Sequence, residues 1–434
     1  MKRLAAALCC ALLLSACTPV FLSTNDLIRP PKLSDVQTQV ENALLSALGL
    51  GRGGITLKYP RSGEYRSAFM FYDIDNNGQD EALVFYSAGG DDATRINILS
   101  EASGSWVSVY DLPGIGQEIE SVSFASLTRD DKLDMIVGWE SAGDPLRTLS
   151  VLRFDGDRLR TLFTGSYSGY AIANLDDDPL EELVLVGLPG SSMPYVRLVK
   201  PDLNRLDVVS EVELNQDFIS LEQITAGSLS PAIRGVVIDG LLDSRTLATE
   251  AVALVDGKLT LPLEAAPEYY DLTQRPANGV LSLDINKDGF IELPTPLTAP
   301  GYEDVKKADQ LALTQYRQVS TAGFVPGVTC FINPTAGYRF TLPSRWVGKV
   351  SLSVQASTGE VKFFRYAGSL EDQSGELLRI RVYSLKDYQD KFDTEKYIQI
   401  GRKGNFVYYA YLHREGAGEL ALKKEELSGL FTLL

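Results

Sequence analysis

The chain has 434 residues and a formal net charge of −16, from 41 Lys and Arg against 57 Asp and Glu, with a single histidine. Residues 17–329 hold 24 basic and 45 acidic side chains, a net of −21, whereas residues 330–434 hold 15 and 12, a net of +3. This acidity argues against a nucleic-acid partner, because the phosphate backbone is also negative. The length exceeds that of one hydrophobic core, and the charge change predicts a domain boundary near Thr329.

The first 32 residues are predicted to serve export and tethering. A basic start and an apolar run over residues 4–14, too short to cross a bilayer, are typical of a secretory signal. Leu14-Ser15-Ala16-Cys17 resembles the bacterial lipobox, which implies removal of residues 1–16 and a lipid on Cys17 that anchors an extracytoplasmic protein to the cell membrane. An ordinary signal peptide beside a cysteine is the alternative. Residues 17–32 are expected to be a tether.

A helix of about 14 residues is predicted next. Ser34-Asp-Val-Gln37 has the spacing of a capping box, apolar residues follow on one helical face, and Gly49 ends the pattern. The apolar face indicates that this helix packs on the domain that follows.

Oxygen-bearing side chains at positions 1, 3, 5 and 9 of a short loop, followed by an apolar stretch, occur four times. We call these segments the first loop (73–81), the second loop (126–134), the third loop (174–182) and the fourth loop (284–292). Such oxygens are what a hard cation such as calcium needs, and glycine at position 6 allows a left-handed turn. The EF-hand is excluded because position 12 falls on Val84 and Thr295. Metal-free Asx turns are the alternative.

Between the loops, alternating apolar runs flank short turns rich in Asp, Asn and Gly, which predicts β-hairpins. The loops, with a degenerate copy at 228–236 that has no carboxylate, start 53, 48, 54 and 56 residues apart. A period of about 50 residues with four strands is that of a β-propeller blade. We therefore predict a mainly β protein: a propeller-like domain of about 5–7 blades over residues 33–329, then a small α+β domain over 330–434. Residues 55–59 and 311–316 are expected to close the array.

The loop-plus-strand unit resembles the FG-GAP/VCBS-type repeat of integrin α-chain propellers and bacterial surface proteins, over residues 55–320. The resemblance implies that the loops hold calcium. The ligands that it implies are Asp73, Asp75, Asn77 and Glu81; Asn174, Asp176, Asp178 and Glu182; and Asp284, Asn286, Asp288 and Glu292. The second loop departs from the pattern, because Ser126 and Thr128 replace carboxylates and Asp131 replaces the glycine.

In the C-terminal part, alternating runs predict antiparallel strands, with short helices over 391–400 and 424–433. His413 is the only histidine, so no Ser-His-Asp triad or His-rich zinc site can form, and Cys330 is expected to be a buried apolar residue. No catalytic residue is predicted, although paired carboxylates for glycoside chemistry stay open.

The hypothesis from the sequence is a lipid-anchored, calcium-binding protein with a binding or assembly role at the cell envelope, its ligand an envelope protein or a glycan. Two alternatives remain: an extracellular hydrolase of polysaccharide with carboxylates along the propeller axis, or an accessory subunit of a membrane complex.

Overall fold

The structure is a computed structural model that describes residues 33–434 except 91–92, 129–131, 142–145, 157, 177, 204, 264–267, 385–395 and 414–416. The predicted signal peptide, the tether and Cys17 lie outside the described residues. The described part is mainly β, as predicted. None of its helices is both long and apolar enough to cross a membrane.

The predicted N-terminal helix is confirmed as α3 (Asp35–Leu48). Ser34 and Gln37 form the capping box in both directions, and Gly49 ends the helix with a positive φ of 68°. Val40 and Leu44 are fully buried in a core shared with the first sheet. The helix therefore covers the outer face of that sheet.

Antiparallel strands form six sheets that follow one another in chain order. The first sheet contains β1 (Ile55–Leu57), β2 (Phe69–Tyr72), β3 (Glu81–Ala88), β4 (Arg95–Ala102) and β5 (Ser105–Pro113). The second contains β6 (Glu118–Ala125), β7 (Asp134–Glu140), β8 (Arg147–Phe154) and β9 (Leu159–Tyr167). The third contains β10 (Gly169–Ala173), β11 (Glu182–Gly187), β12 (Tyr195–Asp202) and β13 (Arg205–Glu213).

The remaining sheets are less regular. The fourth contains β14 (Ser220–Ser230), β15 (Ile233–Leu241), β16 (Thr246–Val255), β17 (Lys258–Thr260) and β18 (Arg275–Pro276), with helix α4 (Glu268–Leu272) before β18. The fifth contains β19 (Leu293–Thr298), β20 (Ala312–Ser320), β21 (Gly323–Asn333), β22 (Tyr338–Thr341) and β28 (Phe431–Leu433). The sixth contains β23 (Val350–Gln355), β24 (Glu360–Arg365), β25 (Glu376–Ser384), β26 (Ile398–Lys403) and β27 (Phe406–Leu412).

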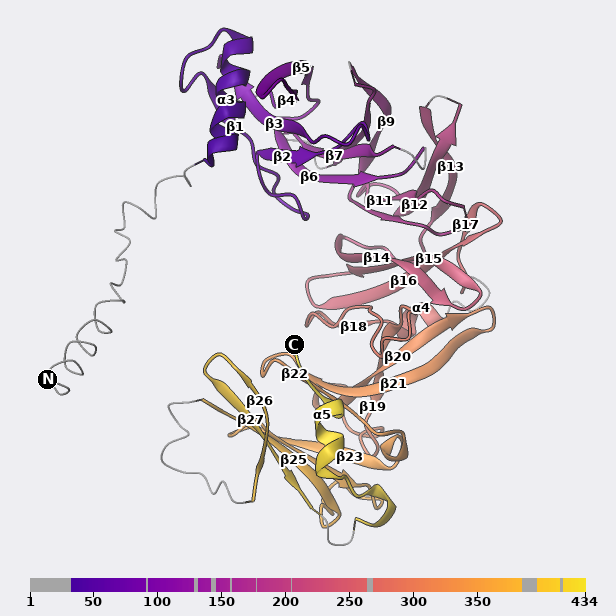
Figure 1. Cartoon of the computed structure of the whole chain (residues 1–434). Coiled ribbons are helices and arrows are strands. Elements are labelled where there is room, and N and C mark those ends of the chain that lie inside the picture. Colours follow the sequence, from indigo (N-terminus) through magenta and orange to yellow (C-terminus); the bar gives the residue numbers. More distant parts are fainter. Residues whose placement is uncertain are drawn as a thin grey trace, which may run out of the picture.

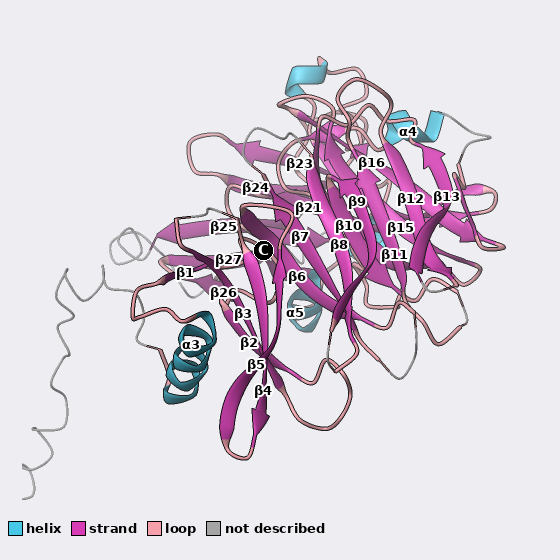
Figure 2. Ribbon diagram, turned by 90° about the horizontal axis from the view of Figure 1, so that it is seen from above, coloured by secondary structure: helices cyan, strands magenta, loops and turns pink. Residues whose placement is uncertain are grey.

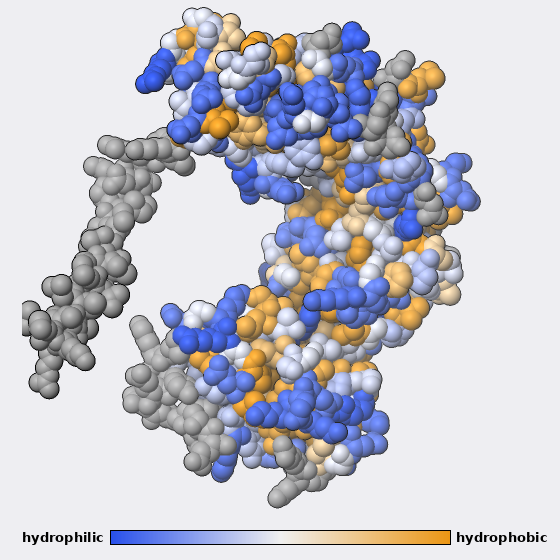
Figure 3. Space-filling model, in the orientation of Figure 1, coloured by the Kyte–Doolittle hydropathy of each residue, from blue (hydrophilic) through white to orange (hydrophobic). Residues whose placement is uncertain are grey.

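Each sheet packs on the next through a shared hydrophobic core, which explains why the strands after the loops are apolar on both faces. All six described residues of β11, for example, are buried. Figure 1 shows the result as an open arc that begins at α3 and ends at the sixth sheet, and Figure 2 shows the strands of successive sheets in layers. In the face shown in Figure 3, polar residues cover most of the surface and the inner side of the arc is hollowed. The successive four- and five-stranded antiparallel sheets thus resemble the blades of a β-propeller in their strand pairing and in their order along the chain.

The prediction that the two ends of the array close it is wrong. Ile55–Leu57 forms β1 and pairs with β3 of the first sheet, whereas Leu313 and its neighbours form β20 of the fifth. The two segments therefore belong to sheets at different places along the arc. β1 pairs with β3 of its own sheet, across the intervening β2 in the chain, and β20 pairs with its sequence neighbours β19 and β21.

The predicted boundary near Thr329 falls inside β21, a continuous strand. This strand pairs with β20 on one side and with β22 on the other, and β22 pairs in turn with the C-terminal strand β28. Residues after 329 thus complete the fifth sheet as well as building the sixth. The predicted helix over 424–433 is shorter: α5 spans Leu427–Leu430 and gives way to β28, and residues 398–400 of the predicted helix over 391–400 begin β26.

Candidate cation-binding loops

Three of the four loops connect two strands that are consecutive in the chain and neighbours in one sheet. The first loop joins β2 to β3, the second joins β6 to β7, and the third joins β10 to β11. The fourth loop precedes β19, and Leu283 bridges to Glu292 where a first strand would lie. Position 9 of each loop is thus the first residue of a buried strand or the residue just before it. The strand holds the carboxylate at position 9 in place, and the rest of the loop folds toward this carboxylate.

The first loop is closed by hydrogen bonds from its own backbone. The amide N–H groups of Asn77 and Gly78 donate to the two carboxylate oxygens of Asp73, at 3.0 and 2.8 Å. That of Asn77 also approaches Oδ1 of Asp75 at 3.1 Å, an Asx turn. Asn76 and Gly78 take positive φ values of 58° and 88°, the left-handed turn that the glycine predicts.

Glu81 completes the first loop from the base of β3. Its Oε2 accepts a hydrogen bond from the amide of Ile74 at 3.2 Å, and the residue is 2% exposed. Oxygens of Asp73, Asp75 and Glu81 all lie within 4.8 Å of one another. Burial, followed by the nearby charge of Asp75, raises the pKa of Glu81 to about 7. The cluster therefore favours a positive charge, which a proton or a cation can supply.

The fourth loop repeats this arrangement. Asp288 and Gly289 donate their amide N–H groups to Asp284 at 3.0 and 2.8 Å, and Ile285 donates to Oε2 of Glu292 at 3.0 Å. Carboxylate oxygens of Asp284, Asp288 and Glu292 form a second cluster within 4.8 Å. Burial, opposed by the Ile285 hydrogen bond and reinforced by the nearby aspartates, raises the pKa of Glu292 to about 7. Two loops that start 211 positions apart in the chain thus present the same candidate metal ligands, two aspartates and a glutamate.

The third loop also gathers its carboxylates, but around a lysine. Oxygens of Asp176, Asp178 and Glu182 lie within 4.8 Å of one another. Nζ of Lys200, on β12, lies 2.6 Å from Oδ2 of Asp176, 2.9 Å from Oε1 of Glu182 and 3.8 Å from Oδ2 of Asp178. Although burial opposes ionisation of Lys200, hydrogen bonds to these carboxylates raise its pKa. Asn174 donates a hydrogen bond from Nδ2 to the backbone carbonyl of Asp178, at 2.6 Å.

The second loop contains an arginine in the corresponding place. Arg153, on β8, donates to Oδ1 of Asp134 from Nε at 2.9 Å and from Nη2 at 2.7 Å, and Thr128 donates to Oδ2 at 2.9 Å. Asp134 is fully buried and Arg153 is 7% exposed. Asp131 lies outside the described residues. A buried ion pair therefore occupies the base of this loop.

Sequence reasoning found the loops and their acidic residues but missed Lys200 and Arg153. Each basic residue lies 18 or 19 positions beyond position 9 of its loop, in the strand that pairs with the one following the loop. That repeated spacing was the available signal. In the described part of the chain, the carboxylates of the first and fourth loops form no ion pair with Lys or Arg, which sets them apart from the other two.

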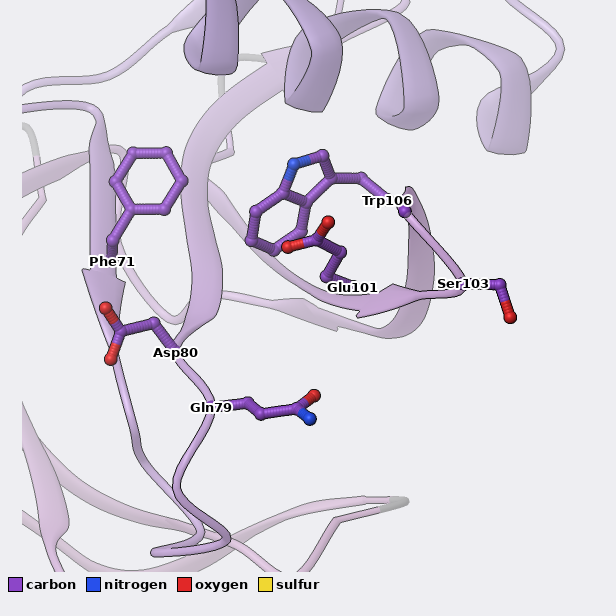
Figure 4. A pocket seen from close by; sticks show the side chains of 7 residues that line it. Phe71, Gln79, Asp80, Glu101, Ser103 and Trp106 are labelled. Atoms are coloured by element: carbon purple, nitrogen blue, oxygen red, sulfur yellow. The ribbon is translucent and has the colours of Figure 1, made fainter.

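A pocket of about 570 Å³ lies beside the first loop (Figure 4). Gln79 and Asp80 of the loop line one side, and Glu101 and Ser103 of the β4–β5 hairpin line another. Phe71 and Trp106 meet edge to face with ring centroids 5.8 Å apart. Aromatic faces next to several hydrogen-bond acceptors suit a ligand that carries both apolar faces and polar hydrogens, such as a sugar.

A second pocket, of about 370 Å³, is lined by residues of β6, β10 and β14 and contains Glu120. Tyr167 donates to Oε2 of Glu120 at 3.1 Å, and Ser62 donates to Oε1. Burial opposes ionisation, but these hydrogen bonds, with one from Ser121 and the charge of Arg147, hold the pKa of Glu120 below its ordinary value. The general acid of a glycosidase needs a raised pKa, whereas the surroundings of Glu120 favour its ionised form. Cys330 is buried as predicted, and burial raises the pKa of its thiol to about 11.

No family model matches the sequence, and no curated protein matches it. Among solved structures, the chain is similar to a protein from Lactobacillus plantarum, with 12% identity and a TM-score of 0.30 over 70% of this chain and 85% of that one. It is also similar to the rhamnogalacturonan lyase YesW (9% identity, TM-score 0.30, 72% of this chain and 68% of that one). A rhamnogalacturonan lyase of Bacillus licheniformis shows 10% identity and a TM-score of 0.30, over 71% and 72% of the two chains. Likenesses at this level carry no argument about function.

Proposed function

We propose that the protein is a lipid-anchored, calcium-binding protein of the cell envelope, with calcium held by the first and fourth loops. The observation that carries the proposal is the shared donor set of these loops: two aspartates and a buried glutamate within 4.8 Å, closed by the same backbone hydrogen bonds. Carboxylate oxygens gathered on a tight turn are the ligands that calcium prefers.

The third loop shows how a positive charge fits among the carboxylates of such a loop. There the same kind of cluster surrounds the ammonium of Lys200, so a positive charge is a stable occupant of this loop geometry. Within the part of the chain that the structure describes, the first and fourth loops offer the carboxylates without such a side chain, and Glu81 and Glu292 are buried enough for their pKa values to rise to about 7. Calcium would offset most of the negative charge of each three-carboxylate cluster and hold each loop against the strand that follows it.

The experiment is thermal unfolding of the mature protein in calcium and in EDTA. An ion that binds only the folded state stabilises it by RT ln(1 + [L]/Kd), about 2.7 kcal/mol at 100 times Kd, so calcium should raise the melting temperature. Asp75→Ala and Asp288→Ala should each remove part of that increase. Thr128→Ala, in the second loop, is the matched control and should leave it intact. Identical melting in calcium and in EDTA would mean that the loops are metal-free Asx turns.

For the binding role, we propose that the pocket lined by Phe71 and Trp106 contacts a glycan of the envelope. Gln79 and Asp80 line this pocket and belong to the first loop, so an ion in the loop would fix their backbone. A glycan array read with and without calcium tests the proposal. Trp106→Ala should abolish any binding, because stacking on the ring is lost, while exposed Tyr59→Ala, at a residue that does not line the pocket, should not. Binding that Trp106→Ala leaves unchanged would contradict it.

A further inference from the structure

The register of the sheets places one residue directly across from position 9 of each loop, on the strand that comes next in the chain after the strand following the loop. In each sheet that carries a loop, the facing position lies one step beyond the last residue pair of the antiparallel ladder. The facing residues are Ser100 opposite Glu81, Arg153 opposite Asp134, Lys200 opposite Glu182, and Gln318 opposite Glu292. Residues opposite each other in an antiparallel pair extend from the same face, so each of these side chains starts at the base of its loop.

Charge at the facing position divides the loops into two pairs. Lys200 reaches all three carboxylates of the third loop, and its side chain is 20% exposed. Arg153 makes two hydrogen bonds to Asp134 from a side chain that is 9% exposed. Ser100 and Gln318 carry no charge, and Gln318 approaches only Oδ2 of Asp288, at 3.5 Å. Among the described residues, the two loops that have an acidic cluster and no ion pair with Lys or Arg are the first and fourth, and both have a neutral facing residue.

We propose that the facing residue decides which loops take calcium: Ser100 and Gln318 leave the first and fourth loops open to the ion, whereas Lys200 replaces it in the third. The inference rests on the proposed calcium binding and adds its stoichiometry, two ions per chain. A divalent ion in the third loop would have to displace the ammonium of Lys200 from oxygens that it already contacts. Arg153 fills the second loop in the same way, and there Ser126 and Thr128 supply no carboxylate for an ion.

The consequence for the architecture is that the sheets use two kinds of cation. The first and fifth sheets depend on calcium, whereas the second and third carry their own positive charge on β8 and β12. Removal of calcium should therefore loosen the first and fourth loops and leave the second and third loops as they are.

The test is the number of calcium ions bound by the full mature protein, measured by equilibrium dialysis and by calorimetry. We expect two ions for the natural protein and three for Lys200→Gln, which gives the third loop the facing residue of the fourth. Gln318→Lys should lower the number to one. Lys200→Arg, which keeps the charge, and Lys349→Gln, a change at an exposed lysine remote from every loop, should leave it at two.

Three ions in the natural protein, or two in both the natural protein and Lys200→Gln, would overturn the inference and leave the proposed function intact. No bound ion in the natural protein would overturn the proposed function itself. If Lys200→Gln does not fold, as judged by its melting curve, the loss of one ion in Gln318→Lys remains decisive: two ions in that variant would overturn the inference.

Discussion

Arg275 donates from Nη2 to Oδ1 of Asp239 at 2.6 Å, and the two side chains are 4% and 0% exposed. The pair links β18 to β15 in the fourth sheet, the sheet whose loop has no carboxylates. Asp239 also accepts hydrogen bonds from the amide and hydroxyl groups of Ser282, at 2.9 and 3.1 Å, and Arg275 donates from Nε to the carbonyl of Val280 at 2.7 Å. This network holds the segment that leads into the fourth loop.

We expect Arg275→Ala to lower the free energy of unfolding by about 3–5 kcal/mol, because it leaves Asp239 buried without its counterion. Urea unfolding followed by circular dichroism measures this change. Arg205→Ala is the control: Arg205 also pairs with an aspartate, Asp207, but its side chain is 67% exposed. Loss of that pair should cost less than about 1 kcal/mol. If both variants lost the same free energy of unfolding, burial of the Arg275–Asp239 pair would not be the reason for its contribution to stability.

The parts of the structure that the sequence predicted are those specified by residues close together in the chain. The capping box of Ser34 and the 1, 3, 5, 9 spacing of the loops each lie within nine residues. The capping box formed as expected, and three of the four loops bring their carboxylates together. Lys200 was missed because its relation to Glu182 depends on the register between β11 and β12. Strand register is set by long-range pairing, which local patterns do not reveal.

The same limit explains why the sequence did not reveal the pairing of the last strand, β28, with the fifth sheet. A charge change marks Thr329, but charge does not show that Phe431 returns to pair with Phe340 across β22 and β28. A strand of three residues at the end of the chain carries too short a pattern to be told from the end of a helix. Division of the chain into two domains therefore remains a prediction, with the fifth sheet as the place where both parts meet.

A substitution at Phe431 tests whether the last strand is needed for the packing of the fifth sheet against the sixth. Its ring stacks on Tyr338 with centroids 5.4 Å apart, and it belongs to the core shared by the fifth and sixth sheets. Phe431→Ala should therefore cost about 3 kcal/mol in the free energy of unfolding. Thr432→Ala changes the next residue of the same strand, which is exposed, and should cost less than about 0.5 kcal/mol. Thermal or urea unfolding compares the two. A small effect at Phe431 would mean that the last strand is not needed for the core.

The lipid anchor is tested at the N-terminus. If the sequence Leu14–Cys17 is read as a lipobox, the mature chain begins at Cys17 and carries acyl groups there. Mass spectrometry of the N-terminal peptide of protein isolated from membranes should find this modification. Cys17→Ser should release the protein from the membrane fraction, while Cys330→Ser, at the buried thiol, should leave it there. An unmodified N-terminus at another residue would leave a protein without a lipid anchor.

Glu81 and Glu292 predict how the calcium-free protein depends on pH. Burial and neighbouring aspartates raise the pKa of each folded carboxyl group to about 7, above the ordinary value of 4.5. A raised carboxyl pKa means that the folded state binds the proton more tightly than the unfolded state. Its contribution to stability is therefore fully present below about pH 4.5 and is lost as the pH rises through 7. In EDTA, the melting temperature should fall over this range.

Calcium should oppose that loss, because the ion replaces the proton as the positive charge in both clusters. We expect the difference in melting temperature between calcium and EDTA to be small near pH 5 and to grow toward pH 7.5. The double variant Glu81→Gln/Glu292→Gln removes the two titrating groups, so it should flatten the EDTA curve over this range while the natural protein retains its slope. The same slope in both proteins would mean that other groups control the pH dependence, and that the two glutamates are not held in the buried, carboxylate-rich environment that makes these loops suitable for a cation.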